Sequence, residues 1–191
     1  IEEKLEKYLF NYHKENKYAT GAKKSEIKSK FFPNLKQLLF DVIIQAFVEK
    51  GLIKQSDEFI SLTYFTIEYD ADYRKIKERV LMILDEVKFE LLKIDELSEK
   101  INHPMTDDVL SLMLTEKDLV RINDLVTTRE LYEEAKNILV EFLNKNKKIS
   151  AAQYRDLLNT NRKTAIALLE HFDMLKLTKR IENDRILLNL T

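Results

Sequence analysis

Residues 147–190 carry the pattern that most restricts how this chain can fold. Ser150-Ala-Ala-Gln153 has the sequence of a capping box, in which the serine hydroxyl and the glutamine side chain satisfy backbone groups where a helix begins. After a polar turn at 159–161, a second helix is expected from Arg162, and its apolar residues follow the spacing of one buried helical face: Ala165, Leu168, Leu169 and Phe172. Two short runs around the turn 182–184 indicate a hairpin. The pattern predicts a winged helix-turn-helix.

The same order of elements occurs twice more upstream. Helices are expected over 3–17, 24–31 and 35–50, followed by a hairpin over 52–62. Further helices are expected over 71–89, 94–101 and 106–114, with Thr106 as the cap of the last, followed by a short wing over 119–126. Where the third helix meets the hairpin, the three copies align through Gly51, Asp118 and Lys176. The chain is therefore expected to be mainly α with small β-hairpin wings, as three tandem winged-helix domains at 1–70, 71–127 and 128–191.

Positive charge concentrates in the last copy. Residues 1–70 hold 11 basic and 11 acidic residues, residues 71–144 hold 11 and 17, and residues 145–191 hold 10 and 5. Arg162 and Lys163 stand in the first turn of a helix, where the helix dipole disfavours a cation by about 0.3–1 kcal/mol. A nucleic-acid phosphate at this helix end would favour both side chains. A solvated basic face is the alternative interpretation.

A family resemblance rests on the same residues. Ser150-Ala-Ala-Gln-Tyr-Arg-Asp-Leu-Leu158, Asn161-Arg-Lys-Thr-Ala-Ile-Ala-Leu-Leu-Glu170-His-Phe-Asp173 and Thr178-Lys-Arg180 resemble the C-terminal winged helix of the bacterial selenocysteine-specific elongation factor SelB. The resemblance covers about forty residues. Asn161 and Thr164 depart from the family pattern, as do Lys176, where glycine is common, and the wing turn Glu182-Asn183.

The resemblance implies recognition of the selenocysteine insertion (SECIS) hairpin of messenger RNA by the last domain. It places the family's RNA contacts on Arg162, Lys163, Lys179, Arg180 and Arg185, and we add Asn161 and Lys148 as neighbouring candidates. It also implies a GTPase portion elsewhere in the full-length protein, which would connect this region to selenocysteyl-tRNA and the ribosome. The first two domains are then expected to be spacers or protein contacts, and residues 128–191 to hold most of the RNA affinity.

Several other functions are excluded by composition. Two glycines, neither in a phosphate-loop pattern, argue against nucleotide binding by this chain. The lack of cysteine removes disulfides, thiolate metal sites and cysteine nucleophiles, and it fits a reducing cytoplasm. The three histidines fall in three different copies, so no metal site is expected, and no apolar run is long enough for a membrane span. We expect a monomer that binds without catalysis and without cofactor.

The residues alone do not separate RNA from DNA. A winged helix usually lays its second helix in the major groove of B-DNA, whereas the A-form major groove is too deep and narrow for that. The resemblance favours RNA. A DNA-binding transcription regulator and a protein-interaction scaffold remain as alternatives.

Overall fold

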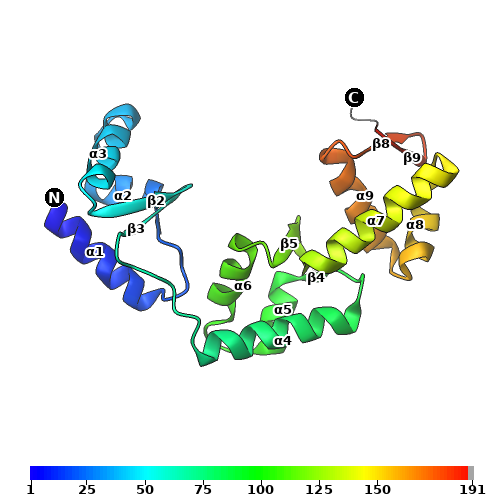
Figure 1. The fold of residues 1–191 in the computed structure, drawn as a ribbon, viewed down its shortest axis with the longest axis horizontal. Helices are drawn as coiled ribbons and strands as arrows, with labels where there is room; N and C mark the ends of the chain where they lie inside the picture. Colours follow the sequence, from blue (N-terminus) through cyan, green and yellow to red (C-terminus); the bar gives the residue numbers. More distant parts are fainter. Residues whose placement is uncertain (189–191) are drawn as a thin grey trace. The chain divides into compact units, whose positions relative to one another are not determined.

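The computed structural model describes residues 1–188 and contains the same set of elements three times (Figure 1). The last three residues of the expected third domain, 189–191, lie outside the described residues. The first module consists of α1 (Glu2–Glu15), β1 (Ala22–Lys23), α2 (Lys24–Phe31), α3 (Gln37–Glu49), β2 (Ile53–Ser56) and β3 (Phe59–Leu62). The middle module consists of α4 (Ala71–Val87), β4 (Leu92–Lys93), α5 (Ile94–Ile101), α6 (Thr106–Thr115), β5 (Leu119–Ile122) and β6 (Leu125–Thr128). The last module consists of α7 (Arg129–Asn146), β7 (Ile149–Ser150), α8 (Ala151–Leu158), α9 (Arg162–Met174), β8 (Thr178–Ile181) and β9 (Asp184–Leu187).

Each module has an antiparallel three-stranded sheet with one topology, ordered β1-β3-β2, β4-β6-β5 and β7-β9-β8. The last strand of the hairpin lies in the centre and pairs with a two-residue strand that precedes the second helix. The mainly α fold with small β wings is confirmed. The two-residue strands were not expected from the sequence, because so short a segment shows no periodicity.

Two expectations about local structure are wrong. Thr106 does not cap α6: Met105 is the N-cap residue, Thr106 is already helical, and its Oγ1 is buried without a hydrogen-bond partner in the described part of the chain. The residue equivalent to Gly51 in the middle module is Lys117 rather than Asp118. Gly51, Lys117 and Lys176 share a left-handed conformation, with φ of 72°, 65° and 58°, and each directly follows the C-cap residue of its helix.

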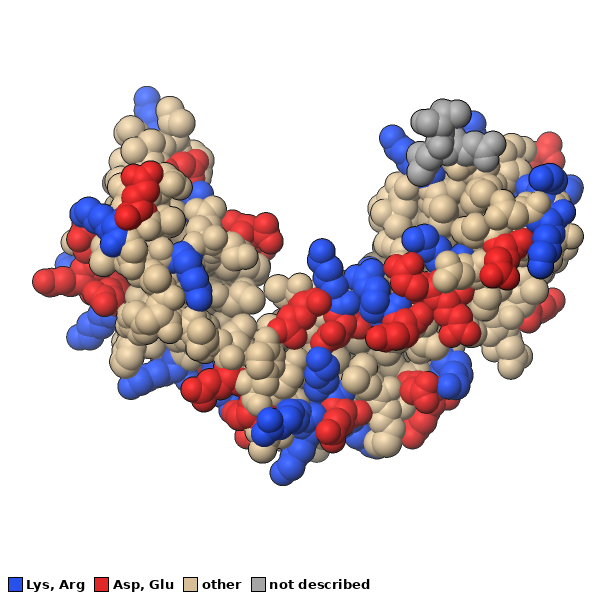
Figure 2. All heavy atoms as spheres, in the orientation of Figure 1, with Lys and Arg blue, Asp and Glu red and all other residues tan. Residues whose placement is uncertain are grey.

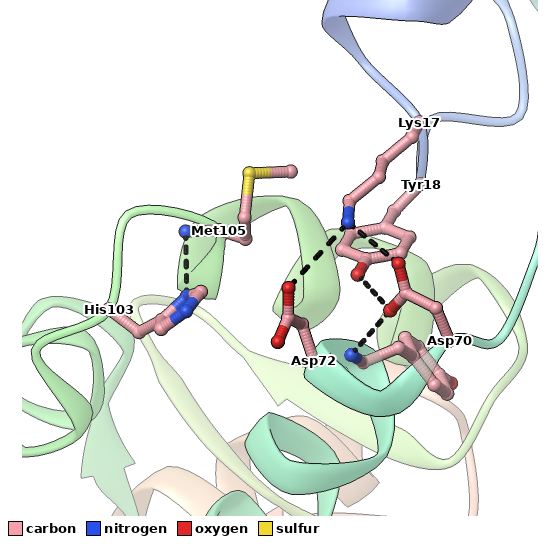
Figure 3. A network of polar contacts seen from close by, with 7 residues as sticks. Lys17, Tyr18, Asp70, Asp72, His103 and Met105 are labelled. Carbon is pink, nitrogen blue, oxygen red and sulfur yellow. Dashed lines mark hydrogen bonds and ion pairs between the residues drawn. The ribbon is translucent and has the colours of Figure 1, made fainter.

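The modules are grouped into two compact units, residues 1–73 and 74–191. Within the first unit, the start of α4 is fixed by a network around Asp70 (Figure 3). Asp70 accepts hydrogen bonds from Lys17 Nζ at 2.7 Å, Tyr18 OH at 2.6 Å and Tyr73 N at 3.0 Å. The bonds from Lys17 and Tyr18 hold the pKa of the Asp70 carboxyl below its usual range. In the second unit, the same figure shows His103 accepting from the backbone N–H of Met105.

The second unit has a hydrophobic core shared by the middle and last modules. Leu91, Val120, Ile122 and Leu125 of the middle module belong to the same buried cluster as Tyr154, Leu169 and Phe172 of the last. Strand β5 contacts both α7 and α9. The division into three domains at 70 and 127 stays a prediction, and the shared core shows that residues 128–191 alone would expose apolar surface to water.

Candidate nucleic-acid interface

The helix-turn-helix of the last module is built by local capping. Ser150 Oγ accepts from Gln153 N at 3.3 Å, and Gln153 Oε1 accepts from Ser150 N at 2.9 Å, so both bonds of the capping box are formed. α8 ends at Asn159 in the left-handed conformation. Asn161 then caps α9, because its Oδ1 accepts from Thr164 N at 2.8 Å. These bonds fix the first turn of α9.

Arg162 and Lys163 lie exposed in that first turn. An ion pair of Arg162 with Asp156 or Asp184 is the structural alternative to a nucleic-acid contact. Asp156 is instead bonded by Arg155 Nε at 2.7 Å, and Asp184 lies 3.1 Å from Lys148 Nζ. Within the described residues neither Arg162 nor Lys163 has a carboxylate partner. Both cations therefore remain available to a ligand.

The wing adds two further exposed cations, Lys179 and Arg180 on β8. Arg180 Nε donates to the carbonyl of Glu182 at 2.9 Å, so its side chain is held against the wing turn. Lys148, close before the short strand β7, is mostly exposed, although it pairs with Asp184. Figure 2 shows lysine and arginine side chains on the visible face of the last module.

Arg185 has a different environment from the other cations expected at the site. It is only 4% exposed, and its Nε lies 3.3 Å from Asp173 Oδ2. Thr178 Oγ1 donates to Asp173 Oδ1 at 2.6 Å, so one carboxylate joins helix α9 to both strands of the wing. We call Asp173, Thr178 and Arg185 the polar triad. This geometry gives Arg185 a role in holding the wing and leaves almost none of its surface for RNA.

Asn161 is also engaged within the protein. Its Nδ2 donates to Glu90 Oε1 at 3.1 Å, across 71 residues of sequence. Beside it, Thr160 Oγ1 donates to the carbonyl of Phe89 at 3.2 Å, and Thr164 Oγ1 accepts from Leu91 N at 3.2 Å. The segment 89–91 of the middle module therefore holds the N-terminal end of α9. Sequence patterns gave no sign of this contact.

The remaining chemistry is limited. No group of three or more His, Asp or Glu side chains that could hold a metal ion occurs within residues 1–188. In the same range, no helix is long and apolar enough to cross a membrane. Burial, with a smaller effect of the nearby Lys54 charge, lowers the pKa of His13 to about 4, and burial also lowers the pKa of His171.

Comparison with known proteins identifies two of the modules. Residues 7–62 and 141–187 match sequence models of the second and third winged helices of elongation factor SelB, described as "Elongation factor SelB, winged helix". Together the two matches cover more than half of the chain. Among curated proteins, no match was found.

Two solved structures have the same fold. The mRNA-binding domain of elongation factor SelB from E. coli, solved in complex with SECIS RNA, is similar at a TM-score of 0.51 and 21% identity, over 62% of this chain and 98% of that one. The bacterial selenocysteine-specific elongation factor EF-Sec is similar at a TM-score of 0.56 and 25% identity, over 98% of this chain and 29% of that one. The chain thus spans less than a third of the length of EF-Sec. From the family-model matches and the repeated fold, the chain belongs to the C-terminal winged-helix region of the SelB family.

Proposed function

We propose that this chain binds a SECIS-type hairpin of messenger RNA through the last module, as part of a selenocysteine-specific translation elongation factor. The observation that carries the proposal is a pair of cations at the start of α9, Arg162 and Lys163, which have no carboxylate partner among residues 1–188 and lie beside a helix N-terminus that favours anions. The E. coli neighbour, solved with SECIS RNA, supports RNA as the ligand.

The proposed contacts differ in kind. Because the A-form major groove does not admit a helix, α9 would meet the RNA with its N-terminal turn and read a base that is extruded from the helix. Arg162 is proposed to reach a base edge, and Lys163, Lys179, Arg180 and Lys148 to contact phosphates. Arg185 is proposed to act indirectly by positioning the wing, and Asn161 by capping α9.

The other parts of the chain have a supporting role in this proposal. Residues 1–70, 71–127 and 128–191 are proposed as the three modules, with the first two connecting the RNA-bound end to a GTPase portion outside this chain. That portion would carry selenocysteyl-tRNA to the ribosome in the cytoplasm. No catalytic step is assigned to residues of this chain.

One titration separates the proposal from its alternatives. The 191-residue chain would be titrated with a SECIS-type hairpin, a hairpin of scrambled loop sequence and duplex DNA, at two salt concentrations. Tightest binding to the SECIS-type hairpin is expected. Equal or tighter binding to duplex DNA would indicate a DNA-binding regulator instead, and no binding to any of the three would indicate a protein-interaction scaffold.

Arg162→Ala tests the residue assignment. A good contact to a base edge contributes about 1–3 kcal/mol of discrimination, so binding to the SECIS-type hairpin should weaken far more than binding to the scrambled hairpin. Lys75→Ala, which removes an exposed cation of α4, is the matched control and should change neither. Folding stability is measured alongside. If Arg162→Ala costs stability but leaves both affinities as before, Arg162 has a structural role.

A further inference from the structure

Equivalent faces of α3 and α9 differ in what covers them. When the two helices are aligned through Gly51 and Lys176, Leu39 and Val42 of α3 correspond to Thr164 and Ala167 of α9. Thr164 is 1% and Ala167 9% exposed, whereas Leu39 is 51% and Val42 59% exposed. The first module therefore exposes to solvent a helix face that is buried in the last module. This face is more apolar in the first module than in the last.

The middle module provides the cover on α9. Leu91 donates its backbone N–H to Thr164, and β5 lies against both α9 and α7. Strand β6 then leads directly into the next module, because its final residue, Thr128, is the N-cap of α7 and accepts from Leu131 N at 3.2 Å. In this arrangement the wing sheet of one module packs on the first and third helices of the next.

The first module has an unfilled groove at the corresponding place. A cavity of about 580 Å³ lies between α1 and α3, lined by Ile1, Glu2, Glu3, Phe32, Ile43 and Phe47. In the last module, β5 contacts the helices equivalent to these two. The groove and the exposed Leu39 and Val42 side chains share helix α3, and we call them together the α3 face.

We propose that the α3 face is the docking surface for the wing sheet of another winged-helix module of the full-length protein. Its hairpin would pack between α1 and α3 as β5 packs between α7 and α9. The occupant is expected to present apolar side chains, as Leu119, Val120 and Ile122 do in β5. The match of residues 7–62 to the second winged helix of SelB, rather than the first, agrees with such a module.

Footprinting of side chains with a photoreactive carbene or hydroxyl radicals tests this proposal. The 191-residue chain and the full-length protein would be labelled in parallel, and peptides from α3 compared by mass spectrometry. The labelling of Leu39 and Val42 is expected to be at least about five times lower in the full-length protein than in the 191-residue chain, because the proposed contact buries both side chains almost completely. Leu38 is a control within the same peptide, because its equivalent, Lys163, remains exposed.

Each other outcome overturns the proposal. Equal labelling of Leu39 in both proteins would mean that nothing covers α3. Protection that appears in the 191-residue chain on raising its concentration, together with a dimer by light scattering, would assign the surface to a second copy instead.

Val42→Glu supplies an independent test. Because Val42 is exposed in this chain, the substitution should leave the thermal midpoint of the 191-residue chain within about 2 °C of the parent. In the full-length protein it should restore the labelling of Leu39, whereas Leu38→Glu should not. If Leu39 stays protected in the Val42→Glu full-length protein, the wing sheet is not what covers it.

Discussion

The first and last modules fill equivalent positions between the third helix and the wing with residues of different chemistry. Their sheets have the same register: Ala22 pairs with Ile60 in the first, and Ile149 pairs with Arg185 in the last. Aligned in this way, the polar triad of the last module, Asp173, Thr178 and Arg185, corresponds to Val48, Ile53 and Ile60 of the first. In the middle module the position of Arg185 holds Val126, which is fully buried.

The difference shows that the fold demands burial at this place but not a particular chemistry. Ile53 and Ile60 belong to the apolar cluster of the first module. The last module buries an arginine there and pairs its Nε with a carboxylate. A buried ion pair of this kind is often no more stabilising than well-packed apolar residues, but losing one partner is costly because the other charge is left buried.

Arg185→Ala should produce the largest effect. It leaves Asp173 without its cation in a mostly buried site, which costs about 3–5 kcal/mol. Urea unfolding should show the loss in the unit that contains residues 74–191. Arg180→Ala is the matched control, because Arg180 is paired directly opposite on β8 but exposed, and it should cost less than about 0.5 kcal/mol.

The combined variant Asp173→Val, Thr178→Ile, Arg185→Ile gives the last module the residues of the first. It should fold, with a stability equal to the parent or higher by about 1–4 kcal/mol, since apolar side chains replace the ion pair. If the combined variant were as unstable as Arg185→Ala, the polar triad would be required by the last module and the equivalence of the two sites would fail.

Acid should destabilise the first unit through His13. The folded-state pKa is about 4 against about 6.5 in the unfolded chain, so only the unfolded state takes up a proton between these values. The contribution of neutral His13 to the free energy of unfolding is fully present above pH 6.5. As the pH falls towards 4 this contribution is lost, which lowers the free energy of unfolding by at most about 3 kcal/mol. Urea unfolding at pH 7.5, 5.5 and 4.5 would measure it.

His13→Leu isolates this contribution from that of His171 in the second unit. The variant should remove the pH dependence of the free energy of unfolding of residues 1–73 and leave that of residues 74–191 unchanged. An unchanged pH profile would show that His13 is not the group responsible. His13 Nε2 accepts from Leu62 N at 3.2 Å, and the centroid of its ring lies 3.6 Å from that of the stacked Phe65 ring. The variant loses this hydrogen bond and is therefore less stable at every pH. For that reason the comparison is between the stabilities of the same variant at different pH values.

The helix starts also differ, because Leu38 of α3 stands where α9 has Lys163. Lys163→Leu should weaken hairpin binding and lower the salt slope by about 0.7–0.9, as expected for one lost phosphate contact. The reverse change, Leu38→Lys, should leave hairpin affinity unaltered. If Leu38→Lys strengthened hairpin binding by as much as Lys163→Leu weakens it, the net charge of the chain would matter more than the place of the cation at α9.

Local features of the last module were predictable, and contacts over long sequence distances were not. The capping box and the start of α9 followed from residue types at short spacing. The hydrogen bonds that join Glu90 and Leu91 to the start of α9 could not be predicted, because no local sequence pattern encodes a contact between residues more than 70 positions apart. The burial of Arg185 could have been found by aligning the copies, since Ile60 and Val126 occupy its position.

The smallest effect concerns the residue that follows the C-cap of the third helix. Gly51 and Lys176 share a left-handed conformation, which costs a side chain with a Cβ about 1 kcal/mol relative to glycine. A Cβ at Gly51 would meet no atom within 4 Å, so Gly51→Ala measures the backbone cost alone. At position 176 the same backbone cost is measured as the difference in stability between Lys176→Gly and Lys176→Ala, because both substitutions remove the lysine charge. Glycine should be the more stable by about 1 kcal/mol at both positions in chemical denaturation. If alanine equals glycine at Lys176 but not at Gly51, the two helix ends are not equivalent, and the alignment that relates α3 to α9 is lost.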